Sequence, residues 1–237
     1  MSGNSAKRGK IFLLAALEME VKPLLEHFKK KSDSPKLYQA VSHETLWLVC
    51  SGVGGRRAES AAEFIAKEKP DFVIGLGYSG GLSPALKKGA FFIPREIGHI
   101  SGEKIRCQFP FQTLESQSAG TLLSTDTIVQ TPDEKAKLHR HADAVDMESF
   151  YAAKVFNRNQ IPFCAIRIIS DDAGESLPFD FSGLLDNEKA IVWGTLRMLL
   201  SKPHKLPALI KLGLSSKAIS RRLSDFSLDL VAAIQKS

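Results

Sequence analysis

Acidic residues stand at the ends of two apolar runs in this chain. Asp146 and Glu148 follow residues 142–145, and Asp171 follows residues 163–169. Runs of this kind predict buried strands, and ligands of open α/β sheets lie outside the carboxyl ends of the strands. Carboxyl groups placed there can bind hydroxyl groups or transfer protons. The two segments therefore predict an acid-lined site for a small molecule.

A structural interpretation of the same acids competes with the chemical one. Asp146 and Asp171 are residue types that cap helices, and Glu148 suits the first turn of a helix, where the dipole favours negative charge. Each acid taken alone fits this interpretation. The chemical hypothesis depends on the two segments lying together in the fold.

A third acidic segment belongs to the first predicted βα unit. Residues 11–16 form an apolar run typical of a strand buried on both faces, and residues 17–28 continue with helical spacing. Glu18 and Glu20 fall in the turn between them. Either acid can favour the helix N-terminus, or it can face a pocket above the sheet.

A glycine-rich segment follows the next predicted strand, residues 71–76. Gly75, Gly77 and Gly80 have the spacing GxGxxG, but a dinucleotide-binding fingerprint requires a helix to open there. Residues 82–94 leave no room for such a helix before a further strand. We therefore interpret the segment as a loop that lines a small-molecule pocket, with a plain turn as the alternative.

Several other segments carry weaker signals. Residues 131–134 have a capping pattern for a helix start. Residues 172–181 contain aromatic residues beside Asp171 and predict a lid that excludes water. A long helix is predicted over residues 184–200. His139 and His141 lack further ligands at suitable spacing, so we expect no metal site.

Length and composition limit the organisation of the chain. Its 237 residues are 43% hydrophobic, which fits one α/β domain, expected over residues 11–200 after a disordered leader, residues 1–10. Residues 201–237 form a basic amphipathic extension that carries +5 of the net charge of +6. The near-neutral body argues against nucleic-acid binding. The extension can dock on the body, on a partner or on an anionic membrane surface.

The cysteines and the hydropathy favour a reducing compartment. Cys50, Cys107 and Cys164 lie far apart in sequence, and Cys164 falls inside an apolar strand pattern. Buried thiols are expected rather than disulfides, which predicts a cytoplasmic protein. No apolar run is long enough to predict a membrane span.

Four segments in order resemble the nucleoside phosphorylase and nucleosidase superfamily. They are residues 16–21 (ALEMEV), 77–82 (GYSGGL), 145–148 (VDME) and 167–171 (RIISD). The branch is similar to the methylthioadenosine/S-adenosylhomocysteine nucleosidases. The extension and the VDMES wording also resemble the hopanoid-associated phosphorylases, which act on a nucleoside attached to a membrane lipid. The resemblance implies a three-layer α/β/α fold with a mixed central sheet, assembled as a homodimer or larger.

The resemblance also implies a reaction, cleavage of the bond between ribose C1′ and a purine nitrogen. Asp171 would be the general acid that protonates the purine at N7, and Ser170 would orient it. Glu148 would bind the ribose 2′- and 3′-hydroxyl groups, with Met147 packed against the sugar. Glu20 would position and activate the attacking water. General-acid help of this kind contributes ~10²–10⁴-fold.

The remaining implied substrate contacts surround the base. Val129 would meet the base through its main chain, Ile128 and Phe181 would flank it, and Gly80 would line the pocket. Tyr78 and Ser79 adjoin Gly80 and are expected to bind substrate as well. Tyr78 replaces a serine common in these nucleosidases and Ile128 replaces an aromatic residue, so both bear on which nucleoside is bound.

The residues leave open which nucleophile is used and which residue is the partner of Arg167. Glu18 and Glu20 would repel phosphate, which favours water, whereas Arg56 and Arg57 could supply a phosphate site for a phosphorylase using phosphate as co-substrate. Arg167 is expected either to bridge to Glu148 or Glu20 or to form a plain structural ion pair. No other cofactor is expected. A non-catalytic nucleoside-binding module is a further alternative.

Overall fold

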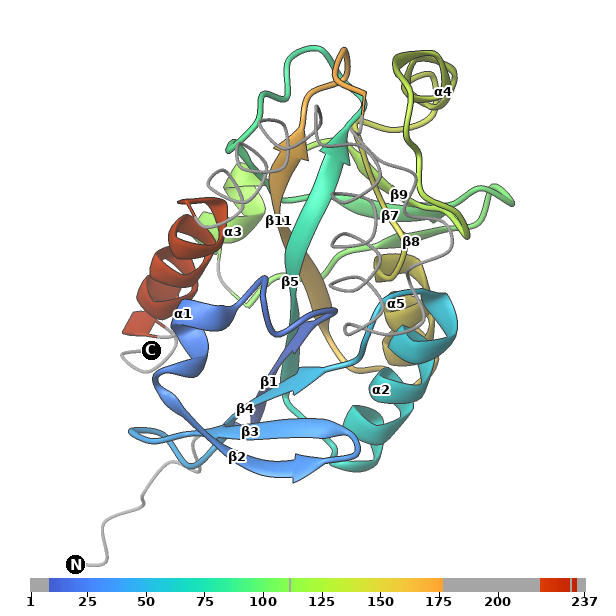
Figure 1. Cartoon of the computed structure of the whole chain (residues 1–237). Helices are drawn as coiled ribbons and strands as arrows, with labels where there is room; N and C mark the ends of the chain where they lie inside the picture. The colour runs from blue at the N-terminus through green and yellow to red at the C-terminus, as the bar shows by residue number, and fades with distance from the viewer. Residues whose placement is uncertain (1–8, 111, 177–217, 231, 234–237) are drawn as a thin grey trace, which may run out of the picture.

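The computed structural model of the chain describes residues 9–110, 112–176, 218–230 and 232–233 (Figure 1). Phe181, the predicted helix 184–200 and most of the predicted leader lie outside the described residues. The second half of the predicted lid and most of the basic extension lie outside them too.

A mixed sheet forms the centre of the described chain, as predicted (Figure 1). Its middle strands run parallel, with β1 (Ile11–Ala15) between β4 (Leu46–Cys50) and β5 (Phe72–Gly81), and β11 (Phe163–Asp171) alongside β5. These strands are mostly apolar, as expected for strands of a sheet that is covered on both faces. The parallel arrangement brings their carboxyl ends to one region of the molecule.

The other half of the sheet joins β5 through an antiparallel contact. β10 (Ala144–Asp146) pairs with Gly80 and Gly81 of β5, and β9 (Thr121–Ser124) and β7 (Glu96–His99) continue in parallel from it. The remaining strands lie at the margins: β2 (Phe28–Asp33), β3 (Lys36–Ala40), β6 (Phe91–Phe92) and β8 (Lys104–Arg106).

Helices on both sides of the sheet complete three layers, which confirms the predicted fold class. α2 (Gly55–Lys67) and α5 (Ser149–Arg158) lie side by side on one face (Figure 1). α1 (Lys22–Leu25) and the helix at residues 218–230 lie on the other face. The short helices α3 (Gln112–Gln117) and α4 (Pro132–Leu138) connect strands of the second half-sheet.

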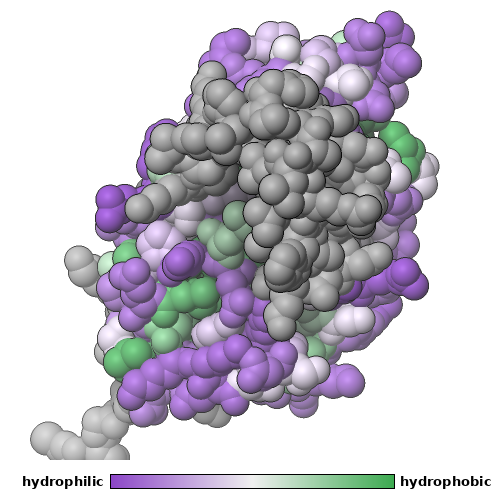
Figure 2. Space-filling view, viewed as in Figure 1, coloured by the Kyte–Doolittle hydropathy of each residue, from purple (hydrophilic) through white to green (hydrophobic). Residues whose placement is uncertain are grey.

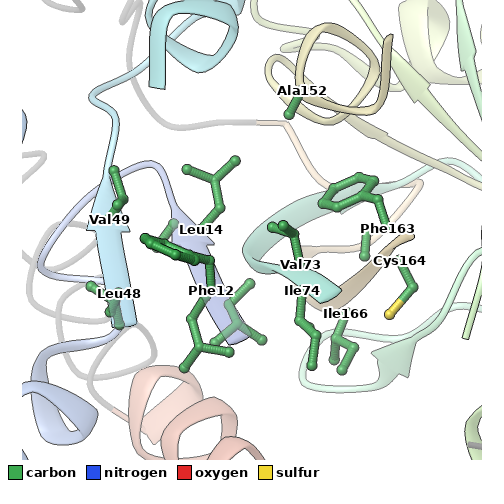
Figure 3. Close-up of a cluster of buried hydrophobic side chains, with 14 of the residues drawn as sticks. Phe12, Leu14, Leu48, Val49, Val73, Ile74, Ala152, Phe163, Cys164 and Ile166 are labelled. Atoms are coloured by element: carbon green, nitrogen blue, oxygen red, sulfur yellow. The ribbon is translucent and has the colours of Figure 1, made fainter. Parts of the chain in front are cut away.

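The hydrophobic core lies between the sheet and these helices. Figure 3 shows core side chains on both sides of the central strands: Val73 and Phe163 lie toward Ala152 of α5, whereas Ile74 and Ile166 point to the other side. All of these side chains are at most 8% exposed. The three cysteines are free and buried, as predicted, and Cys164 lies in the same core.

The predicted helix over residues 17–28 is wrong in extent. Residues 17–21 form turns, in which the amide of Glu20 donates to Leu17 O (3.2 Å), and α1 occupies a single turn. Phe28 begins β2 and pairs with Ala40 of β3. Leu24 and Phe28 are both buried, so the apolar spacing arises from a turn followed by a strand.

The glycine-rich segment is also different from the prediction, because it is a strand and not a loop. β5 continues without interruption to Gly81, and no helix opens after it. Glycine suits these positions because neighbouring side chains approach the backbone: a Cβ on Gly77 would lie 2.7 Å from Arg167 Nη1, and one on Gly80 would lie 3.2 Å from Asp171 Oδ2.

The described part of the basic extension docks on the body of the protein. Ser224 Oγ accepts from the amide of Leu24 (3.2 Å), Arg222 donates to Gly89 O (2.5 Å), and the Phe226 ring lies 4.7 Å from that of Phe91 between centroids. Its apolar residues face inward. This confirms, for residues 218–230, the alternative in which the extension packs on its own chain.

The described surface carries both hydrophilic and apolar residues. Hydrophilic residues predominate on the face shown in Figure 2, with scattered apolar patches between them. Among the described residues, no helix combines the length and apolar character needed to cross a bilayer.

Candidate active site

A cavity of about 260 Å³ opens where β1, β5, β10 and β11 end. This volume is near the lower end of the range of small-molecule sites, ~300–1,000 Å³. Of the predicted site residues, ten line it: Glu20, Tyr78, Ser79, Gly80, Ile128, Val129, Met147, Glu148, Ser170 and Asp171. Arg167 does not line it, and Phe181 lies outside the described residues.

Glu20 reaches the cavity from the turn after β1. Its Oε2 accepts from the amide of Leu17 (2.9 Å) and its Oε1 from the amide of Tyr78 (3.0 Å). Glu20 is 8% exposed, and burial raises the pKa of its carboxyl group although the two N–H donors and the charge of Arg167 oppose the shift. Glu20 is therefore held firmly at the cavity by backbone amides of two strand ends.

Glu18, the other acid of this turn, has a structural role. It forms an ion pair with Lys36 (2.7 Å) and accepts a hydrogen bond from the Tyr38 hydroxyl. Burial would raise the pKa of Glu18, but these hydrogen bonds lower it below its ordinary value. Of the two acids predicted for the turn, only Glu20 faces the cavity.

Glu148 lies at the start of α5 and meets the glycine-rich turn before α2. Its Oε1 accepts from the amide of Gly54 at 2.7 Å. Burial raises the pKa of Glu148 to about 8, with a further contribution from the negative charge of Asp146, while the Gly54 N–H opposes the shift. The glycine-rich turn before α2 thus brings its backbone against the Glu148 carboxylate.

Asp146 accepts hydrogen bonds from several groups at the bottom of the cavity. Its Oδ1 accepts from Ser124 Oγ (2.5 Å) and from the amides of Glu148 and Ser149 (3.3 Å each). Its Oδ2 accepts from Ser149 Oγ (2.5 Å) and from Arg167. The residue therefore satisfies the start of α5, as the structural interpretation predicts, and it also borders the cavity.

Arg167 forms the plain ion pair of the two predicted alternatives. Its guanidinium lies 3.1 Å from Asp146 Oδ2 and donates to Ser149 Oγ (2.6 Å), with 6% of the residue exposed. The expected bridge to Glu148 or Glu20 is wrong, because the ion pair is formed with Asp146, whose Oδ2 accepts from Nε and lies 3.1 Å from Nη2. Arg167 acts on those two glutamates only through its charge.

Asp171 ends β11 beside Gly80, where its register shifts by one residue. Its Oδ1 accepts from Ser170 Oγ (2.5 Å), and its Oδ2 accepts from Lys135 Nζ (2.5 Å). The residue is 7% exposed. Ser170 therefore contacts the carboxyl group that it was predicted to orient. Lys135 was not predicted at all.

The remaining lining residues form a largely apolar wall. Ile128 and Val129 follow the end of β9, and Val145 and Met147 flank Asp146. Ser79 is 3% exposed, and its Oγ has no hydrogen-bond partner among the described residues. A buried hydroxyl without a partner costs free energy, so a ligand that bonds to it gains specificity at this point.

Tyr78 connects the cavity to the docked C-terminal helix. Its hydroxyl interacts with Ser220, and burial together with the charge of Glu20 raises its pKa above the ordinary value. Ser220 Oγ also donates to the carbonyls of Met19 (3.2 Å) and Glu20 (3.1 Å). The C-terminal helix therefore contacts two walls of the cavity from outside, which the sequence did not indicate.

Other candidate features lie apart from this cavity. A larger hollow of about 440 Å³ lies along β8, and Glu115 is the one acid among the described residues that line it. Arg56 and Arg57 are exposed on α2 and do not line the cavity. Among the described residues, no three His, Cys, Asp or Glu side chains group as metal ligands.

This chain is similar to proteins of known family. The model of the phosphorylase superfamily matches residues 111–191. The 5′-methylthioadenosine/S-adenosylhomocysteine nucleosidase of Buchnera aphidicola is 29% identical over 213 residues, covering 75% of this chain and 91% of the relative.

Solved structures share the fold. The corresponding nucleosidase of Neisseria meningitidis, in complex with methylthio-immucillin-A, is 26% identical, with a TM-score of 0.60 over 70% of this chain and 87% of that one. Futalosine hydrolase of Helicobacter pylori, 18% identical, matches 97% of this chain and 100% of its own with a TM-score of 0.72. The mixed sheet, the four segments around one cavity and these matches confirm the resemblance to the nucleoside phosphorylase and nucleosidase superfamily.

Proposed function

We propose that this chain hydrolyses the N-glycosidic bond of an adenosine-type nucleoside. The observation that carries the proposal is the convergence of three carboxyl groups, those of Glu20, Glu148 and Asp171, on one cavity. They come from the ends of different strands, and each has different polar partners. The names of the matched relatives support the same activity.

The roles follow from what the bond needs in order to break. The sugar becomes oxocarbenium-like and the base must leave as a neutral molecule, so a proton has to reach the purine. Asp171 delivers it to N7, oriented by Ser170. Glu148 accepts hydrogen bonds from the ribose hydroxyls, and Met147 packs on the sugar. Glu20 takes the proton of the attacking water.

The wall that would hold the base is supplied by Ile128, Val129 and Gly80. A side chain on Gly80 would project toward Asp171, so glycine leaves room for the purine edge to approach the acid. Tyr78 and Ser79 border the same space and complete the predicted substrate contacts.

Water is favoured over phosphate as the nucleophile. No lysine or arginine side chain lines the described part of the cavity, whereas Glu20, Asp146, Glu148 and Asp171 do. Phosphate carries negative charge and requires cationic or amide partners, so these acids disfavour it. A phosphorylase acting on a free or lipid-linked nucleoside is therefore the second candidate.

Release of free base tests the proposal. The protein is incubated with methylthioadenosine, S-adenosylhomocysteine or adenosine, with and without phosphate, and adenine is quantified. Adenine release that does not require phosphate is expected. Release that depends on phosphate would identify a phosphorylase, and no release from any of these nucleosides would leave a binding module as the better description.

The predicted assembly and location need separate tests. A homodimer is expected from the resemblance, and sedimentation velocity measures the mass directly. Membrane contact through the basic extension would require residues outside the docked helix, since residues 218–230 turn their apolar side to the body. Co-sedimentation with anionic liposomes, compared with neutral ones, measures that contact; equal recovery from both would count against it.

A further inference from the structure

Lys135 is a lysine with none of its surface exposed. Lysine is almost never fully buried unless its charge is paired. It lies on α4, between the exposed residues Glu134 and Ala136, so its helix turns this one charged residue toward the interior. The cost of burying an ammonium group means that its environment must compensate it.

All three donors of the Lys135 ammonium group are occupied. They reach Asp171 Oδ2 (2.5 Å), Asp172 O (2.6 Å) and Glu175 O (2.8 Å). An ammonium group has three N–H bonds and no acceptor. Lys135 does not line the cavity, so it can influence a bound nucleoside only through Asp171 and the segment that follows.

The other charged groups near this pair have their own partners. Asp172 Oδ1 accepts from the amide of Lys88 (2.5 Å), and Glu175 Oε1 lies 3.8 Å from Lys88 Nζ. Glu134 accepts from the amides of Gln130 and Thr131 (2.9 Å each). Glu20 and Glu148 face Asp171 from other walls of the cavity. Asp171 is thus the carboxylate that contacts the ammonium directly.

We propose that Lys135 is the positioning residue of the general acid and that it supplies, through Asp171, the proton that the leaving purine receives. This inference rests on the proposed function. An ammonium and a carboxylate at 2.5 Å hold one transferable proton between them. Asp171 can therefore pass a proton to the purine and be resupplied from Nζ of Lys135, the group that it contacts directly.

During cleavage one proton moves from Lys135 through Asp171 to the purine. The electron pair of the C1′–N bond goes to the purine, and N7 takes a proton from Asp171. Asp171 receives one from Nζ of Lys135, so its carboxylate ends as it began and Lys135 becomes a neutral amine. Water adds its oxygen to C1′, and its proton passes to Glu20. From there it reaches solvent, which restores the lysine.

The first experiment compares the pH profile of kcat/KM for the wild type, Lys135→Met and Lys137→Met. Lys137 is exposed on the same helix and serves as the matched control. In Lys135→Met the basic limb is expected to move to lower pH, with a loss of about 10²–10⁴-fold above it. A profile of unchanged shape, or a basic limb at higher pH, would overturn the proposal.

A second substrate distinguishes a loss of proton supply from a loss of the folded structure. 4-Nitrophenyl riboside has a leaving group that departs without protonation, so Lys135→Met should retain most of its turnover on it. Equal loss on both substrates would show that the lysine only maintains the structure. If wild-type protein releases no adenine, the proposed function fails; if it does and the variant matches it, only this inference fails.

Two more variants test the proposal even if Lys135→Met does not fold. Lys135→Gln keeps N–H donors facing Asp171 but has no transferable proton, so it should share the profile of Lys135→Met. A wild-type profile in Lys135→Gln would contradict proton supply. The double variant Lys135→Met with Asp171→Asn removes both charges, and it should be folded and inactive on the purine nucleoside. Purine turnover by this variant would also contradict the proposal.

Discussion

Three carboxyl groups of one cavity differ in what surrounds them, and these surroundings suit different tasks. Glu20 accepts from two backbone amides, Glu148 from one amide while facing the charge of Asp146, and Asp171 from an ammonium group and a hydroxyl. Sites that run acid and base chemistry together distinguish their carboxyl groups in this way. These differences support the separate roles that we propose for the three carboxyl groups.

Asp171→Asn tests the general-acid role that we propose for Asp171. The amide keeps the shape of the side chain but cannot supply a proton, so kcat should fall by about 10²–10⁴-fold while nucleoside binding remains. Adenine release gives the first quantity and calorimetric titration the second. Asp172→Asn is the control because Asp172 does not line the cavity. Loss of binding together with turnover would contradict a purely acidic role.

The pH dependence of kcat/KM tests Glu148. Its pKa is raised to about 8, so in the free protein the group is protonated over most of the range below that pH. In the role that we propose for Glu148, its carboxylate form accepts hydrogen bonds from two ribose hydroxyls, whereas the acid form would do so poorly. We expect kcat/KM to rise with pH until about 8, and Glu148→Gln to lose this rise and bind the nucleoside more weakly. A rise of the same size in the variant would assign it to another group.

These acids were predictable from sequence and their partners were not. Asp146, Glu148 and Asp171 end apolar runs, which places them at strand ends whatever the details of packing. Lys135 had no such signal: its neighbours are polar, and its inward direction shows only in its spacing of three residues from Leu138, which packs against a small apolar cluster. The partner of Arg167 depends on side-chain geometry across two strands.

At the scale of the elements, β5 joins the two halves of the sheet. Its first residues pair with β1, its whole length pairs with β11, and Gly80 and Gly81 pair with β10. Glycine-rich sequence normally indicates a turn. Here it permits side chains of β11 and of the first turn to approach the strand backbone, an effect of tertiary packing that local patterns do not record.

Ser220→Ala tests whether the C-terminal helix supports the turn that carries Glu20. Its hydroxyl bonds to the carbonyls of Met19 and Glu20, whereas Ser227, on the same helix, bonds to Leu223 O (2.7 Å) within it. Each variant should lose about 1 kcal/mol of unfolding free energy. Only Ser220→Ala should also lower kcat, by up to about tenfold, the equivalent of ~1.4 kcal/mol.

Denaturant unfolding and steady-state kinetics on both variants provide these values. The buried serines make the pair well matched, because both are at most 5% exposed. An equal effect of the two substitutions on kcat would show that the helix contributes stability alone.

At the scale of the whole molecule, buried acidic side chains line a cavity in a chain of positive net charge. The +6 arises mainly from the extension, and four acids line the described part of the cavity. Burial raises the pKa of Glu20 and of Glu148, so the folded protein holds protons that the unfolded chain releases. Function at the cavity thus has a cost in stability that depends on pH.

That dependence is measurable as a change of melting temperature with pH. Below the ordinary glutamate value of 4.5 both states carry the proton of Glu148, and its contribution to stability is fully present. As pH rises toward about 8 the unfolded chain has lost that proton while the folded protein keeps it, so stability falls across this window. Glu18, whose pKa is lowered, acts in the opposite sense and at lower pH.

We therefore expect the melting temperature to decline from pH 5 to about 8, and the decline to be smaller in Glu148→Gln than in the wild type. Glu44→Gln, at an exposed position, should follow the wild type. Differential scanning calorimetry in buffers of equal ionic strength measures all three. Because a neutral amide cannot release a proton in either state, a decline in Glu148→Gln as steep as that of the wild type would mean that the Glu148 carboxyl group ionises as readily in the folded protein as in the unfolded chain.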